Sequence, residues 1–471
     1  MENGKIYDLI VIGAGPGGYT AAIRGAQLGM SVAVIEKRNR PGGVCLNEGC
    51  IPSKAFLDSS EYFALARDKF ATHGINIEPP KLDLERMMQR KDDIIQKNGD
   101  GILYLFKKHK IDLINGKGAL AAREGELHRV EVTDTEKSFH LEGKNILLAT
   151  GSRAVEIPAI PFDGELIVSA REALSFSEPP EHLLVVGAGY IGLELGSIWK
   201  RLGSEVTVVE ALPKPLASMD SQVVDTLIRA LKKQGLRFFF ETTVKGFSYN
   251  DGKVNVDIEG VSGTSSIKCS KVLVAVGRAP YTEALNLPEA GIETDNSGRI
   301  IVDENYETSA KGVHAIGDII AGPMLAHKAS EEAVAAVESL NGRKSKVDYS
   351  TIPGICYTWP EVASVGRSEE QLVKEGIPYS VGKFSFIANG RARCLDETEG
   401  FVKIIAHTET DKILGVHIVG PKASELIAEA VIAMTLGATA SDMAKAFHAH
   451  PTLSEAVKEA ALDVHGEAIH I

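Results

Sequence analysis

The chain has 471 residues, of which 44% are hydrophobic and 24% charged, and its formal net charge is −12. This composition is typical of a soluble globular protein, and the length predicts three or more domains. The negative charge argues against nucleic acid or an anionic membrane as the main partner. No apolar run approaches the roughly 20 residues needed to cross a bilayer, so no membrane span is expected.

Cysteine is scarce, with five residues in the chain. A low and odd count favours a reducing compartment, because structural disulfides belong mainly to oxidising ones. The segment Met1–Lys5 leaves no room for a targeting peptide ahead of the first expected strand. We therefore expect a cytoplasmic protein that carries one redox-active disulfide.

Residues 6–36 match a dinucleotide-binding unit. The apolar run 8–12 predicts a buried parallel strand, and a helix and a second strand at 31–35 follow it. Between the first strand and the helix lies a turn with glycines at the spacing that binds a pyrophosphate at a helix N-terminus. The second strand ends at an acid that can accept hydrogen bonds from a ribose. These residues are Gly13, Gly15, Gly18 and Glu36.

Two cysteines, Cys45 and Cys50, follow this unit closely in the segment 42–54. A thiol pair beside a dinucleotide site indicates that electrons pass between a cofactor and a disulfide. Residues five apart in a straight helix are separated by about 7.5 Å along its axis, whereas a disulfide needs Cα atoms within about 6.8 Å. If the two cysteines bond, the backbone between them must leave the straight helix, and Gly49 gives it that freedom.

Two other interpretations of the cysteine pair are weaker. A zinc site would need ligands gathered from afar, because the remaining cysteines are Cys269, Cys356 and Cys394. A purely structural disulfide is not needed by a chain that is large enough to bury its own core. No metal site is therefore expected.

The same strand, glycine turn, helix and strand recur at residues 183–210. The glycines of the second copy are Gly187, Gly189 and Gly192, and its second strand ends at Glu210. Two complete copies imply two dinucleotides. A carboxylate at Glu210 repels a 2′-phosphate and so favours NAD over NADP, although Lys214 lies near in the sequence.

Further strand-then-glycine segments at 145–152 and 271–278 bracket the second copy, and a strand at 312–316 leads to Asp318. We expect an α/β protein in which the first dinucleotide domain is split between residues 1–152 and 279–348. The second dinucleotide domain then spans 153–278. From residue 349 alternating strands mix with helices near 423–437 and 452–463, which predicts a C-terminal α+β domain over 349–471.

His450 and Glu455, in the segment 447–455, form the second chemical signal. A neutral histidine held by a carboxylate can carry a proton to and from a thiol. Several plainer interpretations exist. Thr452 and Glu455 also fit a capping box that starts the last helix, His450 alone could be an ordinary histidine, and His-x-His can bind metal. Thiol exchange needs a base, and this favours the catalytic interpretation.

The chain resembles the flavin-dependent pyridine nucleotide–disulfide oxidoreductases from Tyr7 to nearly its last residue. The resemblance rests on the cysteine segment 42–54, the two glycine turns, Gly317-Asp318, the segments 325–328 and 357–362, and the His450–Glu455 segment. Within that family it is most similar to the enzymes that oxidise dihydrolipoyl groups.

The resemblance implies the cofactors FAD and NAD, each at a defined set of residues. FAD is expected in the split domain at Gly13, Gly15, Gly18, Glu36, Lys54, Gly118, Thr150, Gly151, Ser152, Asp318, Met324, Leu325, Ala326 and His327. NAD is expected at Gly187, Gly189, Gly192, Glu194, Glu210, Val244 and Gly277. An ion pair between Lys54 and Glu194 is expected near the reactive edge of the flavin.

The resemblance also implies a homodimer built on the C-terminal domain, in which His450 serves the disulfide of the second copy. The activity implied is oxidation of protein-bound dihydrolipoyl groups with reduction of NAD+, in 2-oxo acid dehydrogenase complexes or glycine cleavage. His450 and Glu455 would deprotonate the substrate, Cys45 would exchange with it, and Cys50 would face the flavin. The catalytic set is therefore Cys45, Cys50, His450 and Glu455.

Two residues depart from the usual family pattern. Val44 replaces a more usual threonine, which removes a hydroxyl beside the flavin. Glu48 places a carboxylate between the two cysteines, where it would disfavour a nearby thiolate.

Two alternatives to dihydrolipoyl oxidation remain at this point. One is an NADH-dependent reductase of another disulfide, such as a low-molecular-weight thiol. The other is a non-enzymatic flavoprotein subunit, although the intact Cys45, Cys50, His450 and Glu455 argue against a loss of catalysis.

Overall fold

The computed structural model describes residues 5–134 and 137–470, and the chain divides into two compact units. The first unit comprises Met1–Ala55, Glu85–Val155 and Gly277–Val347. The second comprises Phe56–Leu84, Glu156–Val276 and Asp348–Ile471. Each unit thus gathers three segments that are far apart in the sequence.

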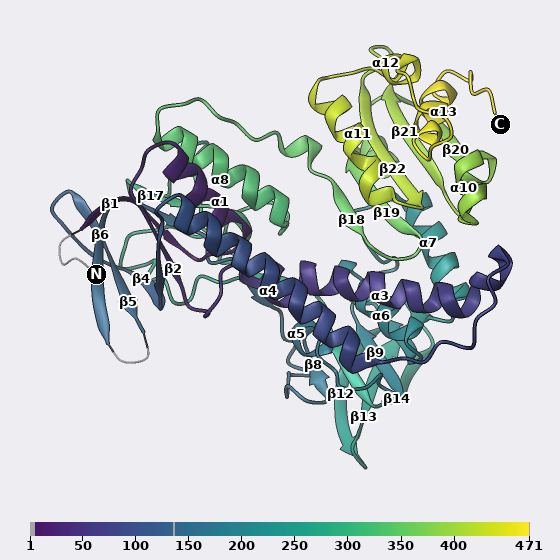
Figure 1. Ribbon diagram of the computed structural model, residues 1–471, viewed down its shortest axis with the longest axis horizontal. Helices are drawn as coiled ribbons and strands as arrows, with labels where there is room; N and C mark the ends of the chain where they lie inside the picture. The colour runs from purple at the N-terminus through teal and green to yellow at the C-terminus, as the bar shows by residue number, and fades with distance from the viewer. Residues whose placement is uncertain (1–4, 135–136, 471) are drawn as a thin grey trace. The chain divides into compact units, whose positions relative to one another are not determined.

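The first unit is built on a seven-stranded sheet with the order β3-β2-β1-β6-β5-β4, in which β17 also pairs with β6 (Figure 1). The strands β3, β2, β1, β6 and β17 run parallel, whereas β4, β5 and β6 form an antiparallel ribbon. Because β17 joins the same sheet as β1, the first domain is interrupted in sequence. The bounds are β1 (Ile6–Ile12), β2 (Val32–Glu36), β3 (Asp112–Asn115), β4 (Lys117–Glu124), β5 (Leu127–Thr133), β6 (Ser138–Leu148) and β17 (Val313–Ala315).

The centre of this sheet is buried on both faces. Residues 9–12 of β1 are at most 3% exposed, which explains why this part of the strand is apolar at every position instead of alternating. Helices α1 and α8 pack against each other beside the sheet (Figure 1). Each fully buried aliphatic side chain contributes roughly 1.5–3 kcal/mol. The other elements of the first unit are α1 (Pro16–Gln27), α2 (Gly43–Glu48), the start of α3 (Cys50–Asp68), α4 (Leu84–Lys108), β7 (Ser152–Ala154), β16 (Arg278–Pro280), η2 (Gly317–Ile319) and α8 (Ala326–Leu340).

The second unit contains a parallel five-stranded sheet with the order β11-β10-β9-β15-β8. A separate antiparallel sheet of β12, β13 and β14 accompanies it. The bounds are β8 (Ile167–Val168), α5 (Ala170–Ala173), β9 (His182–Val186), α6 (Tyr190–Arg201), β10 (Glu205–Val209), α7 (Ser221–Lys233), β11 (Arg237–Phe239), β12 (Thr243–Asn250), β13 (Lys253–Gly260), β14 (Gly263–Cys269) and β15 (Lys271–Val274).

The C-terminal part of the second unit is an antiparallel five-stranded sheet with the order β18-β19-β22-β21-β20 and helices packed against it (Figure 1). Helices α11 and α13 contribute to one core with β21 and β22. The bounds are η1 (Phe70–His73), which precedes this part in sequence, η3 (Tyr349–Thr351), β18 (Gly354–Cys356), β19 (Glu361–Gly366), α9 (Glu369–Glu375), β20 (Tyr379–Ser385), η4 (Phe386–Ala388), α10 (Gly390–Leu395), β21 (Phe401–His407), β22 (Ile413–Gly420), α11 (Ala423–Thr435), α12 (Ala440–Lys445) and α13 (Glu455–Asp463).

Among the described residues, no helix combines the length and the apolar character that a membrane crossing requires.

Candidate active site

The two glycine-rich turns have the same backbone geometry. Gly13 adopts φ +102° and Gly187 adopts φ +103°, in the left-handed region that favours glycine. A Cβ at Gly13 would lie 2.5 Å from the carbonyl oxygen of Ala149. A Cβ at Gly18 or Gly192 would lie 1.8 Å or 2.1 Å from the carbonyl oxygen of the first glycine of its turn. The first and third glycines are therefore required for the tight turn and for the close approach of helix to strand.

The middle glycines leave room for a ligand. Gly15 and Gly189 precede the 12-residue helices α1 and α6. A Cβ at Gly189 would meet nothing within 4 Å, and one at Gly15 would meet only a Cα atom at 3.8 Å. Backbone N–H groups at such a helix start attract a phosphate. Both turns therefore fit the pyrophosphate of a dinucleotide.

The acids at the strand ends are tied to their own turns. Glu36 Oε2 accepts a hydrogen bond from the backbone N–H of Ala14 at 2.8 Å, and Glu210 Oε2 accepts one from Ala188 at 2.7 Å. The second oxygen of each acid accepts one further backbone N–H two residues on. A carboxylate has about four lone-pair sites, so each acid retains capacity for ribose hydroxyls.

Most of the other residues expected at the flavin cluster around the end of β6. Thr150 Oγ1 donates to the carbonyl oxygen of Tyr281 at 2.6 Å, and Ser152 Oγ donates to Asp318. Gly118 lies on β4, where a Cβ would press against Ile12 and Ile35. The remaining expected residues, Met324, Leu325, Ala326 and His327, lie at the start of α8.

A buried ion pair that the sequence did not reveal holds the turn before Asp318. Lys328 Nζ and Glu332 Oε1 are 2.9 Å apart, and both side chains are fully buried. Lys328 donates to the carbonyl oxygen of Gly317 at 3.1 Å, and Glu332 accepts the N–H of Gly317 at 2.8 Å. The ion pair therefore holds both the N–H and the carbonyl oxygen of Gly317, which has φ +78°. A lysine and a glutamate at i and i+4 on a helix usually indicate a solvated face, so only the fold identifies them.

The cysteine pair lies at a break between two helices. Helix α2 ends at Glu48, Gly49 has φ −143° and ψ −105°, and α3 begins at Cys50. The expected departure from a straight helix is confirmed. The pKa of the Cys45 thiol is raised, first by its hydrogen bond with Cys50 and then by burial, while the Lys54 ammonium opposes the shift. The two thiols therefore lie in direct contact in the first unit.

Two further side chains next to the thiols were not anticipated. Burial raises the pKa of Tyr19, and the charges of Cys45 and Cys50 add to this shift. Burial lowers the pKa of Arg278, and nearby Asp318 and Cys50 oppose this shift. Arg278 Nε also donates to Ser152 Oγ at 2.7 Å. A half-buried cation therefore links the thiol pair to the Ser152–Asp318 contact.

Glu48, between the cysteines, forms an ion pair with Arg38, whose Nη2 lies 3.2 Å from Glu48 Oε2. Both side chains are partly buried. The Glu48 carboxylate is thus paired with a cation, and in the sequence it lies two residues before Cys50.

We expect Glu48→Val to lower the apparent thiol pKa of the reduced protein by roughly half a unit. The substitution removes an anion that disfavours the thiolate and leaves the Arg38 cation without this partner. Thiolate absorbance followed against pH measures the shift. Arg38→Gln is the matched control and should move the same titration upward. Identical titrations of Glu48→Val and the unsubstituted protein would contradict the expectation.

His450 and Glu455 form the expected pair in the second unit. His450 Nδ1 lies 2.8 Å from Glu455 Oε1, and 80% of the His450 side chain is exposed. Burial acts to raise the pKa of Glu455, but hydrogen bonds from the Thr452 N–H and from His450 bring it below its ordinary value. Glu455 is therefore ionised at neutral pH, and it orients the ring so that Nε2 is available.

The capping box expected from Thr452 and Glu455 is wrong, because it places the start of the last helix too early. Helix α13 begins at Glu455 and its N-cap is Ser454, not Thr452. Thr452 Oγ1 donates to the carbonyl oxygen of Ala449 at 2.7 Å, and the N-cap residue Ser454 makes no side-chain cap hydrogen bond. The Glu455 carboxylate still accepts the Thr452 N–H at 2.8 Å.

A second histidine–carboxylate pair supports the same loop. The buried His448 ring contacts Glu429 of α11 through Nε2 and the carbonyl oxygen of Ala446 through Nδ1. The hydrogen bond with Glu429 raises the pKa of His448. This pair links the segment before His450 to α11.

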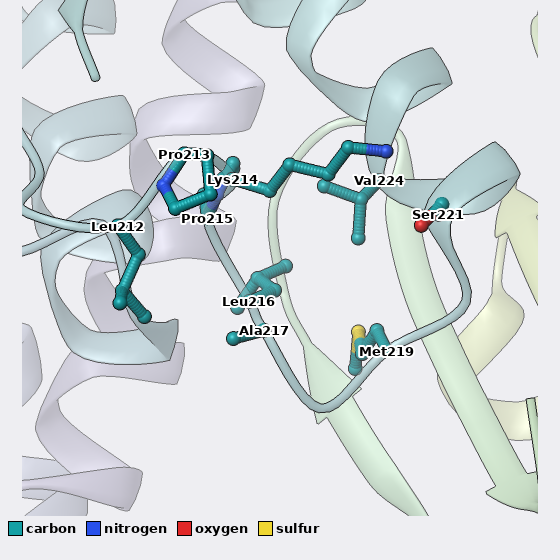
Figure 2. Close-up of a pocket in the computed structure, with 9 residues that line it drawn as sticks. All are labelled: Leu212, Pro213, Lys214, Pro215, Leu216, Ala217, Met219, Ser221 and Val224. Atoms are coloured by element: carbon teal, nitrogen blue, oxygen red, sulfur yellow. The ribbon is translucent and has the colours of Figure 1, made fainter. Parts of the chain in front are cut away.

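The second unit contains a cavity of about 210 Å³, lined mainly by the segment that follows Glu210 in the sequence (Figure 2). Lys214 extends across it toward α7, where its Nζ lies 3.8 Å from Asp225 Oδ1. The buried Glu194 accepts the Tyr357 N–H at 3.1 Å. Val244 lies on β12 and packs on the core of this unit. The lining residues are Leu212, Pro213, Lys214, Pro215, Leu216, Ala217, Met219, Ser221 and Val224.

The structure therefore brings the expected residues together within two groups. The cysteines, Lys54 and the first glycine turn belong to the first unit, as does Gly277. His450, Glu455, Glu194 and the second glycine turn belong to the second unit. The Lys54–Glu194 ion pair and the action of His450 on the thiols join residues of different units, and they stay predictions.

Comparisons with known proteins agree with this arrangement. The family described as pyridine nucleotide-disulphide oxidoreductase matches residues 7–333, and its dimerisation domain matches residues 352–461. Dihydrolipoyl dehydrogenase 2, mitochondrial, from Arabidopsis thaliana is 48% identical over 98% of this chain and 91% of its own length. Dihydrolipoyl dehydrogenase 3 from Pseudomonas putida is 47% identical over 99% of this chain and 100% of its own length.

The solved structure of LpdA from Mycobacterium tuberculosis superposes with a TM-score of 0.90 at 27% identity, covering 96% of this chain and 98% of that chain. These matches confirm the fold class expected from the sequence, with nucleotide-binding domains followed by a dimerisation domain. The chain belongs to the pyridine nucleotide-disulphide oxidoreductase family.

Proposed function

We propose that the protein oxidises protein-bound dihydrolipoyl groups and reduces NAD+ by way of a Cys45–Cys50 disulfide and FAD. The observation that carries this proposal is the contact between the two thiols at the α2–α3 break, in the unit that holds the first glycine turn. Relatives named dihydrolipoyl dehydrogenase, 47–48% identical over nearly the whole chain, support this choice of substrate.

His450 begins the reaction by taking a proton from a dihydrolipoyl thiol at Nε2, while Glu455 holds Nδ1. The substrate thiolate attacks Cys45 Sγ, the Cys45–Cys50 bond breaks, and Cys50 leaves as a thiolate. The second substrate thiol then displaces Cys45, so the lipoyl disulfide forms and the protein retains two electrons on its cysteines.

The Lys54 ammonium opposes the rise in the pKa of Cys45 and so favours a thiolate at the pair. FAD, when bound, would supply the two-electron redox chemistry that connects the cysteine pair with NAD+. Within this proposal Gly13, Gly15, Gly18, Glu36 and the residues around Asp318 hold FAD. Gly187, Gly189, Gly192 and Glu210 hold NAD, with Gly277 and Val244 beside it.

The protein acts in this proposal as a homodimer assembled through the C-terminal domain, with lipoyl domains of 2-oxo acid dehydrogenase complexes as partners. The dimerisation-domain match at 352–461 supports this assembly. We also propose a cytoplasmic location, on the ground that five cysteines in 471 residues suit a reducing compartment.

NAD+-dependent oxidation of dihydrolipoamide by the purified, FAD-loaded protein tests the proposal. We expect rapid NADH formation, and turnover with NADP+ at least about tenfold slower because Glu210 repels a 2′-phosphate. If dihydrolipoamide gives no NADH while NADH still reduces the cysteines, the fold is retained but the substrate is another disulfide.

A further inference from the structure

A lysine on the C-terminal sheet is buried against the nucleotide-binding part of the second unit. Lys403 lies on β21, and its side chain has no solvent exposure. Its Nζ lies 2.8 Å from Asp220 Oδ2, whose side chain is also fully buried, and it contacts Glu369 at the start of α9. Charges without solvent are retained only where their partners are closely placed. Lys403 is therefore held firmly against Asp220.

Asp220 ends the segment that follows Glu210. Its second oxygen, Oδ1, accepts the N–H of Gln222 at 3.1 Å and so caps α7. Two adjacent contacts strengthen the junction: the Ser221 N–H donates to Glu370 Oε1 at 3.2 Å, and Gln222 Nε2 donates to Glu369 Oε2 at 3.3 Å. The start of α7 is thus joined to α9 as well as to β21.

The same segment, residues 211–220, packs on the second glycine turn. The N–H of Leu216 donates to the carbonyl oxygen of Ala188 at 3.3 Å, and Ser218 Oγ lies 3.4 Å from the Tyr190 hydroxyl. Ala188 is the residue whose N–H bonds Glu210. Figure 2 shows side chains of this segment, from Leu212 to Met219, around the cavity that they line. The middle of segment 211–220 therefore packs on the second glycine turn, and its last residue, Asp220, is held by Lys403.

We propose that Lys403 is a positioning residue for NAD, acting through Asp220 and segment 211–220. This inference rests on the proposed function, because it assigns the second glycine turn to NAD. The ion pair holds the segment so that Glu210 and the turn keep the geometry that binds the ribose and pyrophosphate. Lys403 touches neither nucleotide nor thiol, so its loss weakens nucleotide binding without changing the thiol chemistry.

The test is Lys403→Met in the FAD-loaded protein. We expect KM for NAD+ and Kd for NADH to rise roughly tenfold, with kcat and the rate of flavin reduction by dihydrolipoamide unchanged. Lys403→Arg, which keeps the charge, should recover part of the affinity. Lys233→Met is the matched control, because Lys233 ends α7 with an exposed side chain and pairs with Glu399 Oε1 at 2.9 Å instead of with Asp220.

NADH binding, measured by quenching of protein fluorescence, separates the two proposals, because it needs no lipoyl substrate. If dihydrolipoamide fails to reduce the unsubstituted protein, the proposed function fails while the binding comparison still decides the role of Lys403. A folded Lys403→Met that binds NADH as tightly as the unsubstituted protein would overturn the inference. If Lys403→Met does not fold, Glu369→Gln replaces it, because Glu369 lies at the partly exposed edge of the cluster. We then expect a smaller rise in Kd for NADH, and an unchanged Kd would overturn the inference.

Discussion

Cys45→Ser is expected to abolish dihydrolipoamide oxidation, with a loss of more than about 10⁴-fold in kcat. Without the Cys45 sulfur there is no disulfide for the substrate thiolate to attack, and a serine hydroxyl cannot accept the electron pair. The measurement is NADH formation from dihydrolipoamide and NAD+. Cys394→Ser is the matched control, because Cys394 is an exposed cysteine on α10 of the second unit, whereas the pair belongs to the first unit. Its rate should equal that of the unsubstituted protein.

The variant Cys50→Ser separates the roles of the two sulfurs. It should also stop turnover, but its Cys45 thiolate can still attack the disulfide of oxidised lipoamide. The lipoyl S–S bond breaks, one lipoyl sulfur leaves as a thiolate and the other stays bonded to Cys45 as a mixed disulfide, which mass spectrometry of the intact protein detects. Cys45→Ser should form this adduct much more slowly than Cys50→Ser. Equal trapping at both positions would contradict the assignment of Cys45 as the exchanging thiol.

The contact between the two sulfurs affects how the reduced cysteine pair loses its protons. The hydrogen bond between the thiols and the burial of Cys45 both raise its pKa. The pair therefore gives up one proton more readily than two, because the second thiolate would face the first across a short distance. Lys54 favours the first ionisation. In the proposed reaction, electrons leave from a reduced pair with one thiolate and one thiol.

Local motifs were sufficient to predict the dinucleotide units. Gly13, Gly18, Gly187 and Gly192 are required by backbone geometry that recurs wherever a strand turns sharply into a helix, so their spacing is visible in the sequence. The acids Glu36 and Glu210 end strands whose apolar character is equally visible. The helix break at Gly49 followed from the length limits of a disulfide.

The residues that support the site could not be predicted in the same way. Lys328 and Glu332 look like an exposed helical ion pair until the fold buries them against Gly317. Arg278 reaches Ser152 across more than a hundred residues of sequence, and Lys403 reaches Asp220 over a similar separation. Such contacts follow from how sheets and helices assemble, and no local spacing encodes them. The start of α13 was misjudged as well, because the helix begins at Glu455 and its N-cap is Ser454, two residues after the Thr452 that the local motif indicated.

The role of His450 predicts the second large effect. We expect His450→Gln to slow the reduction of the protein by dihydrolipoamide by about 10²–10⁴-fold, because the substrate thiol then has no base to take its proton. Rapid mixing of the oxidised, FAD-loaded protein with dihydrolipoamide measures this half-reaction. NADH-driven reduction of an artificial electron acceptor should proceed at the usual rate, because it bypasses the substrate thiol.

His448→Gln is the control for this variant, because His448 belongs to the same loop but is buried against Glu429. It should remain within a few-fold of the unsubstituted rate. Glu455→Gln should give an intermediate loss, since a neutral amide can still hold Nδ1 but stabilises the protonated ring less. A His450→Gln protein that is reduced as fast as the unsubstituted one would show that the proton leaves by another route. The exposed imidazole beside Glu455 would then serve structure, not catalysis.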